Sequence, residues 1–176
     1  LWARKRALLG AAIVMTTPGI PMIFQGQELH ETLGFHDDVP MRWERAGTHA
    51  GTLRAYSDLA HLRRNLSGST AGLQGPGIFI HHLDNDNKVI AFVRWNLGGP
   101  GDDVYVVANF SSMDFDQNDY VLPFPSPGTW TRRFNSDSKL YGGDFGDIGS
   151  DRIVATGSPP SATLSMGKYS LQIFSK

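Results

Sequence analysis

The chain has 176 residues, a length that fits a single domain or a large domain with a small one. Hydrophobic residues make up 40% of it and aromatic residues 11%, which is enough for a packed core. The formal net charge of −1, without a long basic run, argues against a nucleic-acid or anionic-membrane partner. Because the sequence has no Cys, disulfides and thiolate metal sites are excluded. The compartment stays open, with the cytoplasm slightly favoured.

The first predicted element is a helix over residues 2–16, where apolar side chains recur at helical spacing and Pro18 and Gly19 follow. The basic start at residues 4–6 is also typical of a signal peptide, but no small-x-small cleavage site follows it. Thr and Pro interrupt the apolar run, so residues 7–24 are not predicted to span a membrane. We interpret the segment as an internal helix of a longer protein, and the chain as a fragment.

The second predicted element is a strand over residues 20–25. Its apolar run follows a Pro-Gly turn at once and ends in polar residues, which is typical of a strand buried on both faces in a parallel sheet. Pro21 is tolerated because it opens the strand, where a missing N–H costs least. Gly26 follows the strand and allows a close backbone approach or a positive φ.

The rest of the chain changes character at a linker. Residues 29–51 are predicted to form a long loop, and a second amphipathic helix runs from about Thr52 to Asn65. After a Ser/Gly-rich linker at residues 67–72, short runs with period two predict seven or eight antiparallel strands in a sandwich. An Asp-Asn-Asp-Asn turn joins the first two strands, and Gly98-Gly99-Pro100-Gly101 precedes the third. The expected strands are 78–83, 88–95, 103–110, 120–124, 129–135, 152–156, 162–166 and 169–174.

The run from residue 19 to residue 28 resembles the eighth-strand motif of the α-amylase superfamily, glycoside hydrolase family 13. The core of that motif is Gly-x-Pro-x-x-x-x-Gly-x-Glu, and the matching residues are Gly19, Pro21, Gly26 and Glu28. The resemblance implies that residues 1–72 are the last elements of a (β/α)8 barrel. In such barrels the substrate site lies at the carboxyl ends of the strands.

Later segments resemble the C-terminal β-domain of the same family. Residues 134–137 and 140–143 are similar to the Asn-Ser-Asp…Tyr-Gly-Gly stretch of glucan branching enzymes, and residues 106–111 to an Asn-Phe strand of these domains. Residues 38–43 resemble a Pro-Leu-Asp-Trp segment, with Arg42 in place of the usual Asp. The expected fold is therefore α+β, with a barrel remnant at residues 1–72 and an antiparallel Greek-key β-sandwich at residues 73–176.

The resemblance implies a parent enzyme that acts on an α-glucan, starch or glycogen, either as an amylase or as a 1,4-α-glucan branching enzyme. Such retaining enzymes need a carboxylate nucleophile and a carboxylic acid about 5–5.5 Å apart. The family places both, and a third Asp, on barrel strands that would precede Leu1. No catalytic residue is therefore expected in this chain, which alone is predicted to be inactive. The alternative is a non-catalytic module that binds carbohydrate or only braces the barrel.

Four residues are candidates for substrate proximity, because they would lie at the rim of an intact barrel: Glu28, Gln25, Gln27 and Trp43. Carboxylates and amides bind hydroxyl groups, and aromatic faces pack on sugar rings. Structural roles stay open, with Glu28 as an acid that holds loops together and Trp43 as a core or interface residue. Because side chains alternate along a strand, one of the two glutamines is expected to point away from the site.

No cofactor or metal is predicted. The His residues at positions 30, 36 and 49 are irregularly spaced, and the acidic stretches 84–87 and 144–151 lack a twelve-residue calcium loop, so turns explain them better. Alternation indicates that most of Trp95, Trp130, Phe134 and Tyr141 face the core or the barrel instead of forming a glycan platform.

The last expected partner is a second copy of the chain. The apolar stripes of the two helices would lose the barrel that covers them, and large exposed apolar surfaces are rare in soluble proteins. The alternatives are that the helices pack on each other or on the sandwich.

Overall fold

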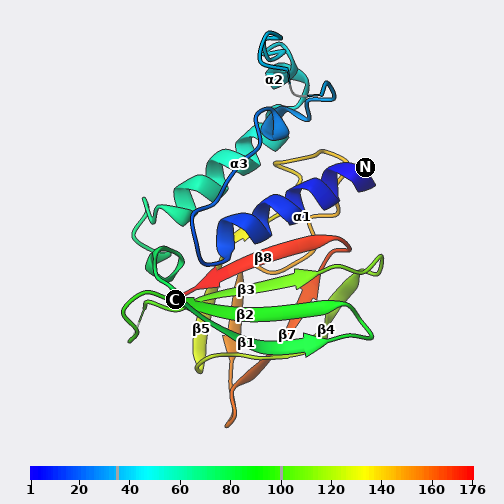
Figure 1. Ribbon diagram of the computed structural model, residues 1–176. Coiled ribbons are helices and arrows are strands. Elements are labelled where there is room, and N and C mark those ends of the chain that lie inside the picture. Colours follow the sequence, from blue (N-terminus) through cyan, green and yellow to red (C-terminus); the bar gives the residue numbers. More distant parts are fainter. Residues whose placement is uncertain (35, 100) are drawn as a thin grey trace.

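The computed structural model describes residues 1–34, 36–99 and 101–176. A helical layer lies on one face of a large sheet, and a small sheet lies on the other (Figure 1). Phe35, in the expected loop 29–51, and Pro100, in the expected connection before the third strand, lie outside the described residues. The elements are α1 (Trp2–Thr16), η1 (Gln27–Leu29), α2 (Arg45–Thr48), α3 (Ala50–Arg63), η2 (Ala71–Gln74), β1 (Gly77–Asp84), β2 (Val89–Trp95), β3 (Val104–Asn109), β4 (Phe115–Pro123), β5 (Gly128–Asn135), β6 (Arg152–Ala155), β7 (Ser161–Met166) and β8 (Ser170–Ser175).

The strands form the predicted antiparallel sandwich. The large sheet has six strands in the order β1-β2-β3-β8-β5-β6, and β4 pairs with β7 in the small sheet. Most strands begin and end close to the expected residues, but β4 begins at Phe115 instead of Tyr120. The β1–β2 connection is a turn, as expected, because the carboxylate of Asp84 accepts the backbone N–H groups of Asp86 and Asn87 at 3.0 and 2.9 Å.

β3 shows why the sheet has two cores. All six of its residues are buried. Tyr105 lies with Trp130 and Phe174 in the core between the two sheets. Val106 faces the opposite side, in the core beneath the helices. Because successive side chains alternate, a central strand that is buried throughout and apolar up to Ala108 serves a layer on each face.

The apolar stripes of α1 and α3 are buried within the chain itself. Leu9 of α1 is 4% exposed and Leu59 of α3 is 1% exposed, and both share one core with Val106 and Ile173. α1 runs along β8 in Figure 1, and α3 packs against α1. The two helices therefore pack on each other and on the sandwich, and their apolar stripes are not left for a second copy of the chain. The domain boundary at residues 72/73 stays a prediction.

The strand predicted over residues 20–25 is wrong for this chain. The described residues contain no strand there, and Ile20 and Met22 are 98% and 79% exposed. A parallel strand needs neighbours that pair with its two edges, and no described strand pairs with this segment. The segment therefore leaves its apolar side chains in solvent.

The four aromatic residues Trp95, Trp130, Phe134 and Tyr141 pack in or against the two cores, as expected for most of them. Trp130 is buried between the sheets and Trp95 is partly buried against the same core. Phe134 and Tyr141 stack with their ring centroids 5.3 Å apart in the core beneath the helices.

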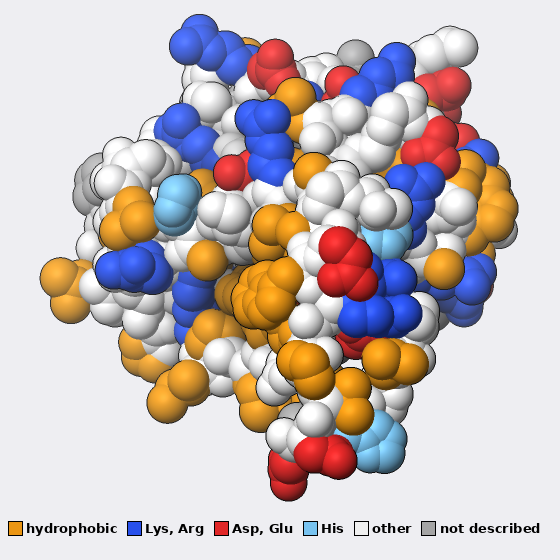
Figure 2. All heavy atoms as spheres, turned by 90° about the horizontal axis from the view of Figure 1, so that it is seen from above, with side chains coloured by type: hydrophobic (Ala, Val, Ile, Leu, Met, Phe, Trp, Pro, Cys, Tyr) orange, Lys and Arg blue, Asp and Glu red, His pale blue; other side chains and the backbone are white. Residues whose placement is uncertain are grey.

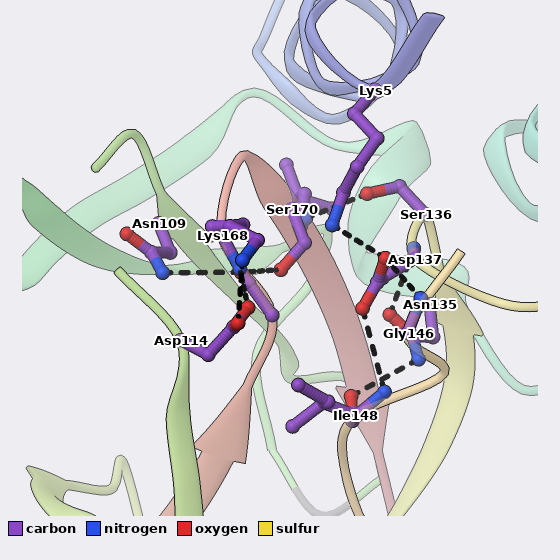
Figure 3. A network of polar contacts seen from close by, with 12 residues as sticks. Lys5, Asn109, Asp114, Asn135, Ser136, Asp137, Gly146, Ile148, Lys168 and Ser170 are labelled. Atoms are coloured by element: carbon purple, nitrogen blue, oxygen red, sulfur yellow. Dashed lines mark hydrogen bonds and ion pairs between the residues drawn. The ribbon is translucent and has the colours of Figure 1, made fainter. Parts of the chain in front are cut away.

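A buried ion pair joins the helical layer to the sandwich (Figure 3). Lys5 Nζ of α1 lies 2.6 Å from Asp137 Oδ1, and the two side chains are 3% and 0% exposed. The carboxylate of Asp137 also accepts the N–H groups of Gly146 and Ile148, at 3.1 and 3.4 Å. The Asn-Ser-Asp stretch thus holds α1 and two loop residues at one point.

Candidate functional site

The segment that carries the barrel-strand motif is bounded by two glycines in the left-handed region. Gly19 has a φ of +106° and Gly26 a φ of +87°. A Cβ on Gly26 would lie 2.6 Å from the Cβ of Glu31. Any other residue would be strained at both positions, so the glycines of the motif have a local conformational reason.

Two arginines position the start of this segment. Arg63 of α3 donates to the carbonyl of Thr17 at 2.6 Å and to that of Gly19. Arg94 of β2, which is fully buried, donates to the carbonyl of Thr16. Carbonyls at the C-terminal end of a helix carry partial negative charge, so both cations suit this place. Sequence reasoning missed both residues, although an arginine within the apolar run of β2 was a visible signal.

The two glutamine candidates lie in different surroundings. Gln27 lies in η1, and its side-chain Oε1 accepts the backbone N–H of Phe24 at 2.8 Å, so the amide closes the turn around Gly26. Gln25 is exposed and lines a shallow hollow with residues 36–40. The structure therefore does not bring their side chains to one site.

Glu28 is half-buried and has one carboxylate oxygen without a partner. Its Oε2 is inaccessible to solvent and forms no hydrogen bond within the part of the chain that the structure describes. Burial raises the pKa of Tyr56, and the charge of Glu28 raises it further, which places the two groups near each other. An unpaired buried oxygen is costly, so this carboxylate is suited to accept a further donor.

Trp43 is 66% exposed, so the interpretation of it as a core residue is wrong. The neighbouring Arg42 binds the carboxylate of Glu31, with Nε 3.0 and 3.2 Å from the two oxygens. The side-chain hydrogen bond from Arg42 holds the pKa of Glu31 well below its usual range. Arg42, which stands where the family pattern has Asp, thus has a partner that the sequence did not predict.

A histidine pair lies beside this loop. His30 Nε2 is hydrogen-bonded to Thr52 Oγ1 at 2.9 Å, and its ring meets that of His49 edge to face, with centroids 5.0 Å apart. Burial lowers the pKa of both imidazoles, and the nearby Arg45 lowers both further. Among the described residues no group of three His, Asp or Glu side chains is placed to hold a metal ion.

A hollow of about 470 Å³ separates α1 from the motif segment. Gly10 and Ala11 of α1 line one side, Met22 and Ile23 line the other, and Gln27 is the only one of the four candidates that lines it. Figure 2 views the molecule from the helical side and shows hydrophobic side chains gathered around a hollow on that face. Arg6, His30, Glu31 and Tyr56 also line it, so apolar and ionisable side chains share this hollow.

The fold and the sequence match define a class of protein. Residues 79–176 match the family described as alpha amylase, C-terminal all-beta domain, which covers more than half of the chain. The chain belongs to this family. No helix among the described residues is long and apolar enough to cross a membrane.

Curated proteins similar to this chain include glucan branching enzymes. The 1,4-alpha-glucan branching enzyme GlgB of Pseudomonas putida is 30% identical over an alignment of 174 residues, and the match covers 94% of this chain and 23% of the relative. The enzyme of the same name from Paramagnetospirillum magneticum is 31% identical over an alignment of 150 residues, and the match covers 81% of this chain and 19% of the relative. The chain thus spans a quarter or less of the length of these relatives.

Solved structures of two other enzymes share the fold. A pullulanase from Paenibacillus barengoltzii superposes with a TM-score of 0.66 at 19% identity, over 98% of this chain and 25% of that one. An alpha-amylase from H. orenii gives a TM-score of 0.59 at 20% identity, over 98% of this chain and 36% of that one. Both likenesses include the helical layer as well as the sandwich, because they cover nearly the whole chain.

Proposed function

We propose that this chain is the C-terminal part of an enzyme that acts on α-glucans, with residues 1–72 completing a (β/α)8 barrel and residues 73–176 forming the sandwich behind it. The relatives named as branching enzymes favour glucan branching over hydrolysis. The observation that carries the proposal is the exposure of Ile20 and Met22, 98% and 79%, within a segment whose sequence matches a barrel strand.

Physical chemistry favours a covered state for this segment. Burial of one large aliphatic side chain is worth roughly 1.5–3 kcal/mol, so several exposed together are unfavourable. Barrel strands on the two edges would bury these side chains and supply the missing backbone hydrogen bonds. α1 precedes the segment and α3 follows it, which is the order of helix, strand and helix in a barrel.

In the completed barrel the four candidates would lie at the rim with different roles. Glu28 would use its unpaired Oε2 to accept a sugar hydroxyl or a loop N–H. Gln25 and Trp43 are exposed and so remain available to a glucan chain. Gln27 would maintain the turn, since its side chain already binds the backbone of residue 24.

The second candidate function is a sandwich that braces the barrel without chemistry of its own. The shared core favours it, because Leu9 and Leu59 of the helical layer pack with Ile173 of the large sheet. Bracing and membership of a glucan-active enzyme are compatible, since one describes the chain and the other its parent.

A chimera tests the barrel proposal. This chain would replace the matching C-terminal region of the Pseudomonas putida branching enzyme, and branching would be followed by the change in the iodine spectrum of amylose. We expect the chimera to be active, and the chain alone and the truncated relative to be inactive. Met22→Asp should abolish the activity, because it places a charge in a buried strand. Met113→Asp changes a methionine that is 58% exposed on the sandwich, and this variant should retain the branching activity. Equal activity of the two variants would contradict the proposal.

The chain tested by itself is expected to self-associate through the same exposed segment. The apolar stripes of α1 and α3 cannot form the contact between copies, because Leu9 and Leu59 are buried within the chain. Sedimentation over a concentration series should show an oligomer that Met22→Asp weakens. A monomer at every concentration would exclude this partner.

A further inference from the structure

A second cavity, of about 340 Å³, lies at one end of the sandwich, away from the motif residues. Its lining consists of Asp103, Ser126 and Lys176 with two glycines of the preceding loop, Gly99 and Gly101. Asp103 directly precedes β3 and Lys176 directly follows β8. Because β3 and β8 are antiparallel neighbours, these two residues meet at the same end of the sheet.

The strand period directs both side chains to the sandwich side. Tyr105 and Phe174 belong to the core between the sheets, and Asp103 and Lys176 are two residues farther along the same strands. The pairing of Val104 with Ser175 makes Asp103 and Lys176 cross-strand neighbours. Two opposite charges therefore replace the apolar core where it opens to solvent.

A tryptophan lies beside them on the same face. Trp95 ends β2, two residues after Val93, and packs partly against the core between the sheets. The pairing of Arg94 with Val104 places Trp95 next to Asp103 across the β2–β3 ladder. The ring of Trp95, however, lies over Gly77 of β1, on the other side of β2 from Asp103, so it does not line the cavity.

The two charges have different partners. Lys176 Nζ donates to Ser126 Oγ at 2.7 Å and to the carbonyl of Pro127 at 2.6 Å, and it lies 5.1 Å from the ring centroid of Trp130. Asp103 is half-buried and has neither a hydrogen bond nor an ion pair within the described residues. Burial raises the pKa of Asp103, while the charge of Lys176 opposes this. The carboxylate is partly desolvated and still has its acceptor positions free.

The chemistry of this lining selects a neutral ligand that is rich in hydroxyls. A carboxylate only accepts hydrogen bonds and an ammonium group only donates them, whereas each hydroxyl does both. The charge of Asp102 also acts on Asp103, so an isolated anion would meet two carboxylates, and an isolated cation would meet Lys176. Hydrogen bonds to charged groups are stronger than neutral ones, and they would restore the lost hydration of Asp103. The volume is near the lower limit of ligand pockets, roughly 300 Å³.

We propose that this cavity binds a short stretch of neutral glucan chain, with Asp103 accepting from one sugar hydroxyl and Lys176 donating to its neighbour. Ser126, whose hydroxyl is bound to Lys176, lines the cavity beside them. The identity of the ligand as an α-glucan rests on the proposed function, but the site is separate from the barrel segment. It would hold a glucan chain on the sandwich without taking part in bond cleavage.

Binding can be measured on the chain as it exists. ¹⁵N-labelled chain would be titrated with maltoheptaose, and the amides of residues 101–103 and 126–128 should shift along a saturable curve. Asp103→Ala should weaken the affinity roughly tenfold or more, the effect of losing one hydrogen bond to a charged group. Lys176→Met should weaken it too. Asp116→Asn, at an exposed carboxylate of β4, is the matched control and should leave the affinity unchanged.

Titrations with maltoheptaose and with inorganic phosphate distinguish a glucan site from an anion site. No shift at residues 101–103 with maltoheptaose, or shifts that Asp103→Ala leaves intact, would overturn the proposal. Saturable binding of inorganic phosphate in place of maltoheptaose would also overturn it, because the site would then be an anion site. If Asp103→Ala fails to fold, Asp103→Asn keeps the shape of the side chain and should still weaken binding. An inactive chimera together with intact glucan binding would overturn the proposed function only.

Discussion

A buried arginine organises the junction between the helical layer and the large sheet. Arg94 is 0% exposed and donates through Nε to the carbonyl of Gly77 at 2.8 Å, and through its terminal nitrogens to the carbonyls of Gly75 and Thr16. Burial and the nearby charge of Arg63 lower the pKa of Arg94 to about 10, so it is still charged at neutral pH. Carbonyl dipoles, including that of the α1 end, compensate the charge in place of a carboxylate.

We expect Arg94→Met to lower the free energy of unfolding by about 3 kcal/mol or more, because each buried carbonyl left without a donor costs roughly 1–3 kcal/mol. Urea unfolding at pH 7 would measure it. Arg152→Met, at an exposed arginine of β6, is the control and should change the value by less than about 0.5 kcal/mol. Similar losses in the two variants would show that the carbonyls do not depend on Arg94.

The histidine pair predicts a pH dependence of stability. Burial lowers the pKa of His30 and of His49 in the folded chain, and neighbouring charges lower both further. Above about pH 6.5 both imidazoles are neutral in the folded and unfolded states, so they contribute no pH dependence. Below that pH the unfolded chain takes up protons that the folded chain does not. The free energy of unfolding therefore decreases as the pH falls from about 6.5 toward the lowered folded-state pKa values.

Replacing the pair should flatten this dependence. Urea midpoints of His30→Gln/His49→Gln, measured between about pH 5 and pH 7.5, should fall less steeply toward acid than those of the parent chain. His61→Gln, at an exposed histidine of α3, should retain the parent slope. An unchanged slope in the double variant would contradict the assignment of the pH dependence to His30 and His49.

At the scale of elements, α3 has one face that supports the fold and one that does not. Leu59 is 1% exposed and lies in the core beneath the helices, while Leu53 on the same helix is 37% exposed. Leu59→Ala should lower the free energy of unfolding by about 2–5 kcal/mol through lost burial and a residual cavity. Leu53→Ala should cost less than about 1 kcal/mol. Thermal and urea unfolding of the two variants would compare them, and equal costs would mean that α3 is not docked as described.

Elements of this chain could be predicted where their partners lie within it. The β1–β2 hairpin, β3 and β8 were predicted close to their observed bounds, because period-two runs meet neighbouring strands of the same chain. Residues 20–25 carry an equally clear apolar signal but form no strand. The signal describes what the side chains require, whereas a strand forms only where another strand donates and accepts hydrogen bonds.

At the scale of the whole molecule, the ion pair of Lys5 and Asp137 fixes the helical layer on the sandwich. Their atoms are 2.6 Å apart and almost fully buried, and Figure 3 shows Asp137 also held by the backbone of residues 146 and 148. The pair is distant in sequence and close in space. Replacing either Lys5 or Asp137 with a neutral residue therefore leaves the charge of the other buried without a partner.

A double-mutant cycle measures this junction. Lys5→Met or Asp137→Asn should each lower the free energy of unfolding by about 3–5 kcal/mol, since each leaves one partner buried and unpaired. The double variant should cost less than the sum of the two. The pair Arg4–Asp144 is also 2.6 Å apart but 35% and 49% exposed, and its coupling should be at most about 1 kcal/mol. Additive losses at Lys5 and Asp137 would contradict a specific junction.

The sequence by itself determined the local features of this protein. Helical and two-residue periods, the turn at residues 84–87 and the glycines at 19 and 26 depend on backbone sterics and on neighbours a few residues away. The same short-range pattern was enough to show the family resemblance, which the match over residues 79–176 confirms.

Only the tertiary structure decided which distant groups meet. The pairing of Arg42 with Glu31, the junction of Lys5 with Asp137, and the meeting of Asp103 and Lys176 at one cavity all join residues that no period relates. Charges and hydrogen-bonding groups act over a few ångströms, and those distances exist only after the chain has folded. The exposed segment at residues 20–24 obeys the same rule, because its burial depends on strands that pair with it in space.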